Sequence, residues 1–356
     1  MQNRSSPLLR LGVVGCDIGR SRYGAVLAAS PELTVTALLD TDDVAARAWA
    51  RECPGKPPVF TETEAFFTDP ARMDAILIAA PLPERARALK YALRSGKPVL
   101  CEVPLTSSLA ETRQVLQEAE SNRILLMPAL PLRFDPAVLH MTLMARDGHL
   151  GTLRQARCDW TYPRDGVATA ERARTLFEYI GCQIIDLCLQ WFGGAISVSA
   201  DLAFPGDPRR EDMLATILIT CTQGQVTLRL ASTPAPQPAE RLQLIGSRAA
   251  LERVAGTCVA SPVPQLSRHA PGRPAEPVLY SQDASGTPVA VARRHALLHH
   301  FALCVQGHQQ PQLHPADIHA AQEVLAAACL SHREGIKVSL PVNAPHAPRA
   351  LPPGTL

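Results

Sequence analysis

The chain has 356 residues and a mass of 38.3 kDa, and this length favours two domains because a single hydrophobic core stops growing near ~250–300 residues. Hydrophobic residues make up 46% and charged residues 19% of the chain, a composition that excludes a disordered protein. The net charge is only +2, aromatic residues make up 4%, and the sequence has no basic block, so nucleic acid is not an expected partner. No apolar stretch approaches the ~20 residues of a membrane span and the N-terminus shows no signal-peptide pattern, so we expect a soluble cytoplasmic protein.

The ten cysteines are scattered along the chain, and most of them lie inside apolar runs. They form no C-x-x-C pair and no Cys/His cluster with zinc spacing. His295, His299 and His300 lie close together in the sequence, but the further ligands that a metal site needs do not accompany them. We therefore predict buried free thiols and no metal site.

Residues 1–128 are predicted to alternate between buried strands and helices. The run Leu9–Cys16 is continuously apolar, which is typical of a parallel strand that is buried on both faces. Further strands are expected at residues 33–40, 59–60, 74–80, 98–102 and 123–128, with helices at about 20–30, 43–52, 84–95 and from Ser107 or Ser108 to 122. This alternation predicts an α/β fold with a doubly wound parallel sheet, the Rossmann arrangement that binds dinucleotides.

Residues 129–341 are predicted to form a second α/β domain with a large open, mainly antiparallel sheet. Short turns such as Gln223–Gly224 join successive strand-like runs without intervening helices. The expected strands lie near residues 152–162, 196–204, 213–222, 225–232, 240–245 and 250–254, and the expected helices near 136–147, 177–192, 293–306 and 314–334. Prolines concentrate in residues 262–277, which we predict to be a long surface loop, and in residues 342–356, which we predict to be a disordered tail.

The turn after the first strand is the strongest local signal of a ligand. It would place the N-terminus of a helix, with its unpaired N–H groups, against the pyrophosphate of a dinucleotide, and its residues are Gly15, Cys16, Asp17, Ile18 and Gly19. Asp40 ends the second strand, where a carboxylate accepts hydrogen bonds from a ribose diol and repels a 2′-phosphate. The expected cofactor is therefore NAD, with NADP as the alternative. The G-x-G-x-x-G pattern is damaged, however, because Asp17 replaces its second glycine and the turn is one residue short. A carboxylate 4 Å from a phosphate charge costs about 4 kcal/mol at an effective dielectric constant of 20. A purely structural turn therefore remains the alternative.

Several further segments occur in an order that resembles the Gfo/Idh/MocA family, the relatives of glucose–fructose oxidoreductase and inositol dehydrogenase. The resemblance runs from about residue 9 to residue 340, and its segments are Gly96–Glu111, Leu132–Pro136, Asp147–Gly151, Gly181–Gly194 and Glu211–Asp212. It implies a Rossmann domain that binds NAD(P), a small-molecule substrate such as a sugar, cyclitol or polyol, and a C-terminal domain whose open sheet makes oligomer contacts. We therefore expect a homo-oligomer, a dimer or tetramer, or pairing with a paralogous subunit.

The catalytic motifs of that family are altered in this chain. The Glu-Lys-Pro motif is Glu102–Val103–Pro104, so the lysine that contacts substrate and nicotinamide is missing. Alignment on the helix motif places Tyr179 at the position of the aspartate and Gln183 at that of the general-base histidine. The histidine that commonly follows the fourth strand corresponds to Arg85. Alcohol oxidation by lysine and histidine therefore does not transfer to this chain.

Tyr179, Gln183, Asp186 and Gln190 follow one another at intervals of 4, 3 and 4, and so form a polar stripe on one face of a predicted helix. The stripe is either an ordinary solvent face or, as the resemblance implies, the lining of an interdomain cleft. Tyr179 is its only proton donor and our candidate catalytic residue. The candidate substrate-binding residues are Glu102, Arg133, Gln183 and Asp186, and the remaining cofactor-binding candidates are Thr41, Ala80, Pro81, Arg85, Glu102 and Pro104.

Three functions compete on these observations. The first is an NAD(P)-dependent oxidoreductase that transfers a hydride to or from a sugar, cyclitol, carbonyl or imine. Because the cofactor carries the hydride, the protein need only orient and polarise the group that accepts it. Thiazolinyl imine reductases, which resemble this chain distantly, also have a shortened glycine turn and no lysine. The second is a non-catalytic family member that binds a nucleotide, a sugar or a partner subunit. The third, a redox-neutral sugar lyase or glycosidase with a resident NAD, also needs a base that the motifs lack.

Overall fold

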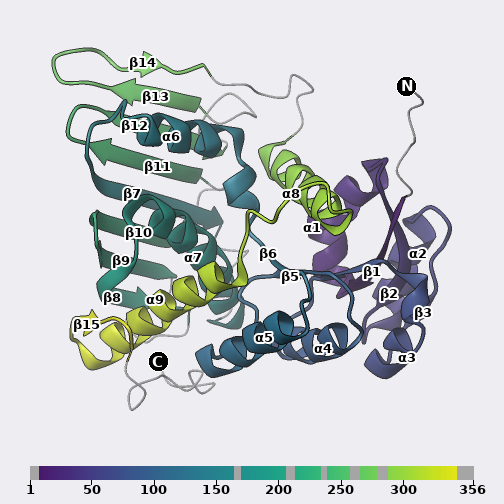
Figure 1. Cartoon of the computed structure of the whole chain (residues 1–356). Coiled ribbons are helices and arrows are strands. Elements are labelled where there is room, and N and C mark those ends of the chain that lie inside the picture. Colours follow the sequence, from purple (N-terminus) through teal and green to yellow (C-terminus); the bar gives the residue numbers. More distant parts are fainter. Residues whose placement is uncertain are drawn as a thin grey trace. The chain divides into compact units, whose positions relative to one another are not determined.

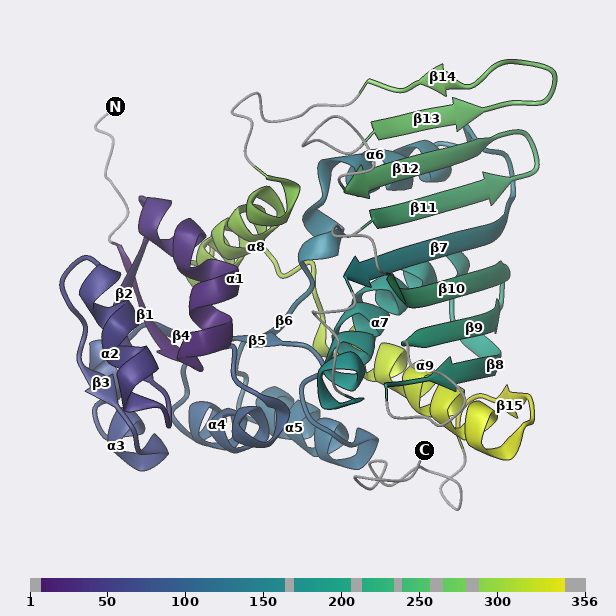
Figure 2. The same ribbon diagram turned by 180° about the vertical axis from the view of Figure 1, so that it is seen from behind.

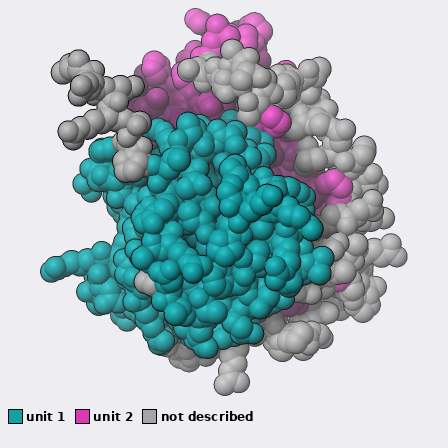
Figure 3. Space-filling model, turned by 90° about the vertical axis from the view of Figure 1, so that its right-hand side faces the viewer, with its two compact units in different colours: residues 1–131, 290–319 teal, residues 132–289, 320–356 magenta. Residues whose placement is uncertain are grey.

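The computed structural model describes residues 8–163, 170–205, 213–233, 239–256, 265–279 and 288–342. The chain divides into two compact units, which Figure 3 colours separately. The first consists of Met1–Pro131 and Ala290–His319, and the second of Leu132–Val289 and Ala320–Leu356. The segment Ala290–His319, which the sequence analysis counted with residues 129–341, thus joins the first unit. The expected motif residues Glu211–Asp212 and the expected tail beyond Val342 lie outside the described residues.

The first unit contains a six-stranded parallel sheet in the order β3-β2-β1-β4-β5-β6, as Figure 2 shows from behind. Leu11, Val13 and Ile76 in its central strands are fully buried, so both faces of the sheet are covered. Its strands are β1 (Leu9–Val14), β2 (Leu33–Leu39), β3 (Val59–Phe60), β4 (Ala75–Ile78), β5 (Val99–Glu102) and β6 (Leu126–Ala129). Its helices are α1 (Cys16–Ala29), α2 (Asp43–Glu52), α3 (Thr63–Phe67), α4 (Leu82–Arg94), α5 (Leu109–Ser121) and α8 (Val289–Val305), with a 3-10 turn η1 (Pro70–Arg72). The predicted Rossmann arrangement is confirmed.

Side-chain caps define where two of these helices begin. The Asp42 carboxylate accepts from the N–H groups of Val44 and Ala45 at the start of α2, and the Ser108 hydroxyl accepts from the N–H of Glu111 at the start of α5. Each cap satisfies N–H groups that have no acceptor inside the helix. Of the two serines predicted as the cap of the latter helix, the structure selects Ser108.

The second unit contains a nine-stranded mixed sheet in the order β14-β13-β12-β11-β7-β10-β9-β8-β15. β7 and β10 pair in parallel, and every other described pair in the sheet is antiparallel. The strands are β7 (Leu153–Pro163), β8 (Ala195–Ala203), β9 (Leu214–Cys221), β10 (Gly224–Thr233), β11 (Ala239–Gly246), β12 (Ala250–Gly256), β13 (Gln265–His269), β14 (Glu276–Pro277) and β15 (Val338–Ser339). The helices are α6 (Pro136–Arg146), α7 (Ala170–Phe192) and α9 (Pro315–Glu334), which starts in the first unit, and a 3-10 turn η2 (Pro131–Phe134) precedes α6. The predicted open, mainly antiparallel sheet is confirmed.

The strands β13 and β14 lie in the proline-rich segment that was predicted as a surface loop, and that prediction is wrong for these residues. β13 pairs with β12, and Pro277 lies opposite Ser267 on the outermost strand. Proline cannot donate a ladder hydrogen bond, but a strand at the edge of a sheet does not need every donor. The prolines therefore mark an edge here and do not end the sheet.

The helices of the second unit lie on one face of its sheet. Figures 1 and 2 show α6 and α7 on this face, and Ala156, Cys158 and Trp160 of β7 are buried on alternate positions beneath them. The opposite face carries polar and charged side chains at the intervening positions, such as Arg157 and Asp159. In the part of the chain that the structure describes, no helix is both long enough and apolar enough to cross a membrane.

Candidate functional site

The carboxyl edge of the parallel sheet brings together the ends of four strands that carry predicted site residues. Gly15 follows β1, Asp40 follows β2, Ala80 and Pro81 follow β4, and Glu102 ends β5. The strand order reverses direction between β1 and β4, which is where an open α/β sheet leaves a crevice for a ligand. The predicted cofactor residues of the first unit therefore share one edge.

Gly15 is required by the geometry of this edge. Its φ of +90° lies in a region that side-chain-bearing residues avoid, and a Cβ there would come within 2.5 Å of the Ala79 carbonyl oxygen. A Cβ on Gly19 would lie 3.0 Å from the Trp49 ring. These two glycines provide a tight turn and a close helix contact, which are two of the three roles of glycine in a dinucleotide turn.

The helix α1 begins at Cys16, directly after Gly15, whereas the sequence predicted its start near Arg20; that boundary is wrong. The Gly19 N–H already donates to the Gly15 carbonyl at 3.0 Å, so the predicted turn residues Cys16, Asp17 and Ile18 form the first helical turn. First-turn N–H groups have no acceptor within a helix, and those of Asp17 and Ile18 fit an anion. Asp17 is exposed at the same place, and its carboxylate is the one group of this turn that opposes a pyrophosphate.

Asp40 joins the end of β2 to the start of α1. Its carboxylate accepts from the Cys16 N–H at 2.5 Å and from the Asp42 N–H at 2.9 Å, and Thr41 is exposed beside it. These two bonds hold the carboxylate in place at the edge of the sheet. Burial and the neighbouring Asp40 charge raise the pKa of the Cys16 thiol to about 12, so Cys16 is a protonated thiol at neutral pH although it begins a helix.

Arg85 is buried, with 4% of its surface exposed. Its guanidinium donates to the Ala80 carbonyl at 2.8 and 3.0 Å and to the Pro104 carbonyl at 2.5 Å. Arg85 thus ties the segment after β4 to the segment after β5, where the Val103–Pro104 peptide is cis. Its predicted contact with a cofactor stays a prediction; what the structure shows is that Arg85 shapes the backbone at this edge.

Glu102 has no exposed surface and makes two contacts that the sequence analysis missed. Tyr23 donates its hydroxyl to one carboxylate oxygen at 2.7 Å, and Arg22 donates to the other at 2.8 Å. Both partners lie on α1, about 80 residues earlier in the chain. No sequence pattern signals a pairing over such a separation.

The polar stripe of α7 is not a solvent face, so that alternative is wrong for three of its four residues. Tyr179 is 7% exposed, Gln183 6% and Asp186 1%, and only Gln190 is exposed. Asp186 accepts two hydrogen bonds from Arg133 of η2, at 2.5 and 2.7 Å. This paired geometry fixes both groups in one plane. The structure therefore brings the predicted substrate residues Arg133 and Asp186 together, with Tyr179 and Gln183 on the same helix.

The described cysteines form no disulfide bond with one another, and seven of the nine are buried. Cys158 and Cys188 lie closest, with their sulfur atoms 3.7 Å apart, too far for a disulfide bond. Within the described ranges, no group of three His, Cys, Asp or Glu side chains is placed to hold a metal ion.

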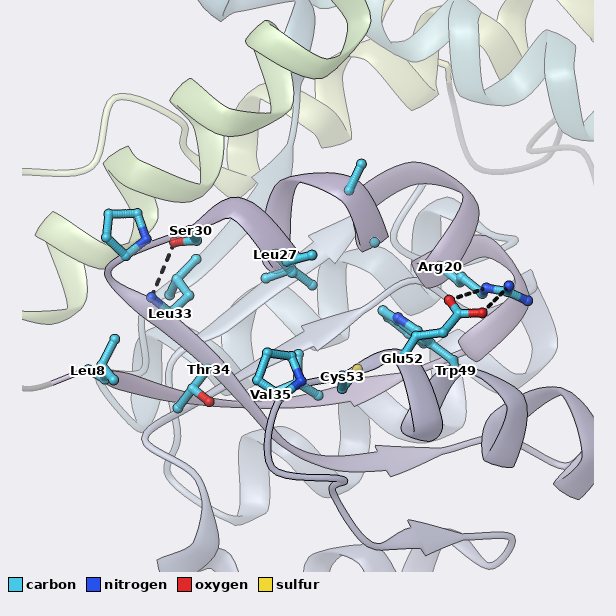
Figure 4. Close-up of a pocket in the computed structure, with 15 residues that line it drawn as sticks. Leu8, Arg20, Leu27, Ser30, Leu33, Thr34, Val35, Trp49, Glu52 and Cys53 are labelled. Atoms are coloured by element: carbon cyan, nitrogen blue, oxygen red, sulfur yellow. Dashed lines mark hydrogen bonds and ion pairs between the residues drawn. The ribbon is translucent and has the colours of Figure 1, made fainter.

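A groove of about 480 Å³ in the first unit is lined by α1, α2 and the start of β2 (Figure 4). Its lining includes Leu8, which precedes β1, and Leu33 and Val35 at the start of β2, together with Trp49 of α2. The lining also includes Arg20 of α1 and Glu52 of α2, and Trp49 lies against Gly19 of the predicted cofactor turn.

Comparison with known proteins agrees with this geometry. Residues 9–130 match the profile of the Gfo/Idh/MocA family, described as an oxidoreductase family with an NAD-binding Rossmann fold. Over these residues the chain is similar to the Gfo/Idh/MocA oxidoreductase family. The match covers β1 to β6, the same strands whose ends carry Gly15, Asp40 and Glu102. The expected cofactor class, NAD, is the one that this family description names.

Two relatives of known activity share about a third of the aligned residues. Inositol 2-dehydrogenase 2 of Saccharopolyspora erythraea is 32% identical over 200 residues, which are 55% of this chain and 57% of that protein. Human trans-1,2-dihydrobenzene-1,2-diol dehydrogenase is 31% identical over 193 residues, 52% of this chain and 57% of that protein. The chain thus spans a little over half the length of these relatives.

The similarity in fold to solved structures extends over nearly the whole chain. A solved oxidoreductase from Agrobacterium radiobacter, in complex with NAD+, L-tartaric acid and magnesium, superimposes with a TM-score of 0.76 over 93% of this chain and 98% of that one. The identity is 15%, so this likeness shows the fold alone.

Proposed function

We propose that this protein is an NAD(H)-dependent oxidoreductase of the Gfo/Idh/MocA type with an altered site. The observation that carries the proposal is the Gly15 turn, which starts α1 at the point where the strand order reverses, next to the fixed carboxylate of Asp40. When bound, the nicotinamide ring supplies or accepts a hydride, and the protein orients the reactants. The substrate class is a sugar, cyclitol, carbonyl or imine.

The residues of the first unit fit a dinucleotide in most respects. The N–H groups of Asp17 and Ile18 would bind the pyrophosphate, and Asp40 would accept from the hydroxyls of the adenosine ribose. Asp40 also repels a 2′-phosphate, so NADH is favoured over NADPH. The opposing Asp17 carboxylate is exposed, and water therefore screens its repulsion to well below the ~4 kcal/mol of a partly buried pair.

Parallel calorimetric titrations with NADH and NADPH test the cofactor assignment. We expect micromolar binding of NADH and at least tenfold weaker binding of NADPH. D40A should bring the affinities for NADH and NADPH closer together, because it removes the negative charge beside the ribose. Failure of the folded wild-type protein to bind either dinucleotide would refute the proposal.

The residues of the second unit supply the polar groups of the proposed reaction. Tyr179 is the proton donor, Gln183 is a hydrogen-bonding residue, and Arg133 and Asp186 form a fixed charged pair for the substrate. Tyr179 and Gln183 are largely buried, which suits donors that must act away from bulk water. Once a substrate is found by following NADH oxidation, Y179F should lower turnover by ~10²-fold or more. An unchanged rate would remove Tyr179 from the mechanism.

A non-catalytic binding subunit is the second candidate function, and the residue types at two positions of the family's motifs favour it. Val103 is apolar and buried with 1% of its surface exposed, and Gln183 carries no ionisable group, so the chain lacks both the lysine and the general-base histidine of the family's motifs. Such a protein would bind NADH without oxidising it. A panel of carbonyl and imine substrates that leaves bound NADH unoxidised would support this candidate.

We also propose a homo-oligomer formed through the polar face of the second unit's sheet. Opposite charges alternate on this face, with ion pairs between Arg229 and Asp159 and between Arg241 and Glu252, both at 3.5 Å. Leu218 of β9 is 42% exposed on the same face. A second copy would present the same alternating pattern and pair with it. Light scattering should give the mass of a dimer or tetramer, and a monomer would reject this proposal.

A further inference from the structure

Glu102 is the most deeply buried carboxylate of the cofactor edge. It has no exposed surface, and an ionised carboxylate in such a place needs a counter-charge and hydrogen-bond donors. The turn that follows it provides neither, because Val103 is apolar and 1% exposed. The donors come from α1, where the Tyr23 hydroxyl and the Arg22 guanidinium each bind one carboxylate oxygen.

Arg22 differs from Tyr23 in its access to solvent. The Arg22 side chain is 22% exposed, whereas Tyr23 has no exposed surface. Tyr23 therefore acts as an internal donor, while Arg22 carries a permanent positive charge that reaches the surface beside the end of β5. A guanidinium is planar and rigid, so the bond to Glu102 fixes its orientation at this place.

The position of this pair along the sheet indicates which half of a dinucleotide it would serve. Asp40 follows β2 and, in the proposed function, marks the adenosine half on one side of the reversal point between β1 and β4. Glu102 ends β5, on the other side of that point. The Arg22–Glu102 pair is thus associated with the nicotinamide half.

We propose that Arg22 is a positioning residue for the nicotinamide half of the cofactor, and that it supplies from α1 the cation that Val103 does not supply from the turn after β5. Through Glu102 it fixes the end of β5, and α1 is the helix whose first turn is proposed to hold the pyrophosphate. The two halves of the site are therefore linked by one helix. This inference rests on the proposed function, since it requires that the edge binds a dinucleotide.

The test compares two ligands that differ in the nicotinamide ring. NADH and ADP-ribose are titrated by calorimetry into the wild-type 356-residue chain and into its R22M variant. We expect R22M to bind NADH about tenfold more weakly, as is typical for the loss of a charge-assisted hydrogen bond, and ADP-ribose within twofold of wild type. R22K keeps the charge and should recover most of the NADH affinity.

Arg20 provides the matched control, because it lies on the same helix and pairs with the exposed Glu52 at 2.5 Å. R20M should bind both ligands like wild type. Equal losses of NADH and ADP-ribose affinity in R22M would show a structural role and overturn the inference, as would unchanged NADH affinity. If wild type binds ADP-ribose and NADH but R22M shows no selective loss, the proposed function stands and only this inference fails. If wild type binds neither, both fail.

A second variant keeps the test decisive if R22M does not fold. E102Q preserves the shape and the acceptor for Tyr23 but removes the charge that orients Arg22. It should also weaken NADH binding selectively, by about tenfold. NADH binding by E102Q at the wild-type affinity would overturn the inference independently of R22M.

Discussion

The salt bridge of Arg253 is the feature of the second unit whose removal should cost most. Arg253 on β12 and Asp135, the cap of α6, are both fully buried, and the two groups lie 2.8 Å apart. Glu240 on β11 binds the same nitrogen at 3.0 Å and is 23% exposed on its side chain. R253M keeps the apolar volume of the side chain but removes the Arg253 counter-charge from the buried Asp135 carboxylate.

The expected loss in the free energy of unfolding is ~3 kcal/mol. Breaking a buried ion pair from one side typically costs ~3–5 kcal/mol. Two observations favour a loss near the lower end of this range. Asp135 keeps its hydrogen bonds from the Ala137 and Val138 N–H groups. In the described structure, the Arg253 Nε and Nη1 atoms are buried without a hydrogen-bond partner. Removing these two unsatisfied donors recovers part of the loss.

Urea unfolding of the second unit measures this loss. In a W49F background, the fluorescence arises from Trp160 and Trp191 only, and both of these lie in the second unit. The matched control is R241M, which breaks the 3.5 Å pair with Glu252 on the adjacent strand; Arg241 is 58% exposed, so its loss should be below ~1 kcal/mol. If R253M and R241M cost the same, the assignment of Arg253 as a buried counter-charge is incorrect.

Three further outcomes follow from the first unit. G15A should destabilise the protein by at least ~2 kcal/mol more than G55A, because both glycines have positive φ but only Gly15 has backbone within 2.5 Å of a Cβ; equal losses in thermal melts would contradict this. The Cys16 thiol, with a pKa of about 12, should have about thousandfold less thiolate at pH 8 than a thiol with the ordinary value of 9, so rapid alkylation of Cys16 in the native protein, mapped by mass spectrometry, would be unexpected. The Arg10 hydrogen bond lowers the pKa of Asp74, so this pair stabilises the fold above the ordinary aspartate pKa and loses that effect as the pH falls through the lowered value. D74N should therefore remove up to ~1 kcal/mol at pH 7 and flatten the acid side of the stability curve, and a D74N curve parallel to wild type would contradict this.

The fold of the first unit was predictable because its strands are continuous apolar runs separated by helices with clear caps. The second helix was predicted at its observed bounds, Asp43–Glu52, since Asp42 is a strong cap. The start of α1 was not predicted correctly, because nothing in the sequence shows whether Cys16 belongs to a turn or to the first turn of a helix. Only the positive φ of Gly15 and the Asp40 bond to Cys16 decide it.

The candidate site was predictable only in its list of residues, not in their partners. Asp40 and Glu102 follow strands, so their positions at the sheet edge could be inferred. That Glu102 would bind Arg22 and Tyr23, or that Arg85 would bind the Pro104 carbonyl, depends on contacts between segments 19 to 80 residues apart. Edge strands were missed for a related reason: prolines in β14 resemble a loop until the neighbouring strand is known.

A crystal structure of the 356-residue chain with NADH bound tests the central claim most directly. We expect the pyrophosphate at the N–H groups of Asp17 and Ile18, the adenosine ribose on the Asp40 carboxylate, and the nicotinamide beside Glu102 at the end of β5. Dinucleotide density at another surface, or an empty carboxyl edge at a saturating NADH concentration, would contradict the account.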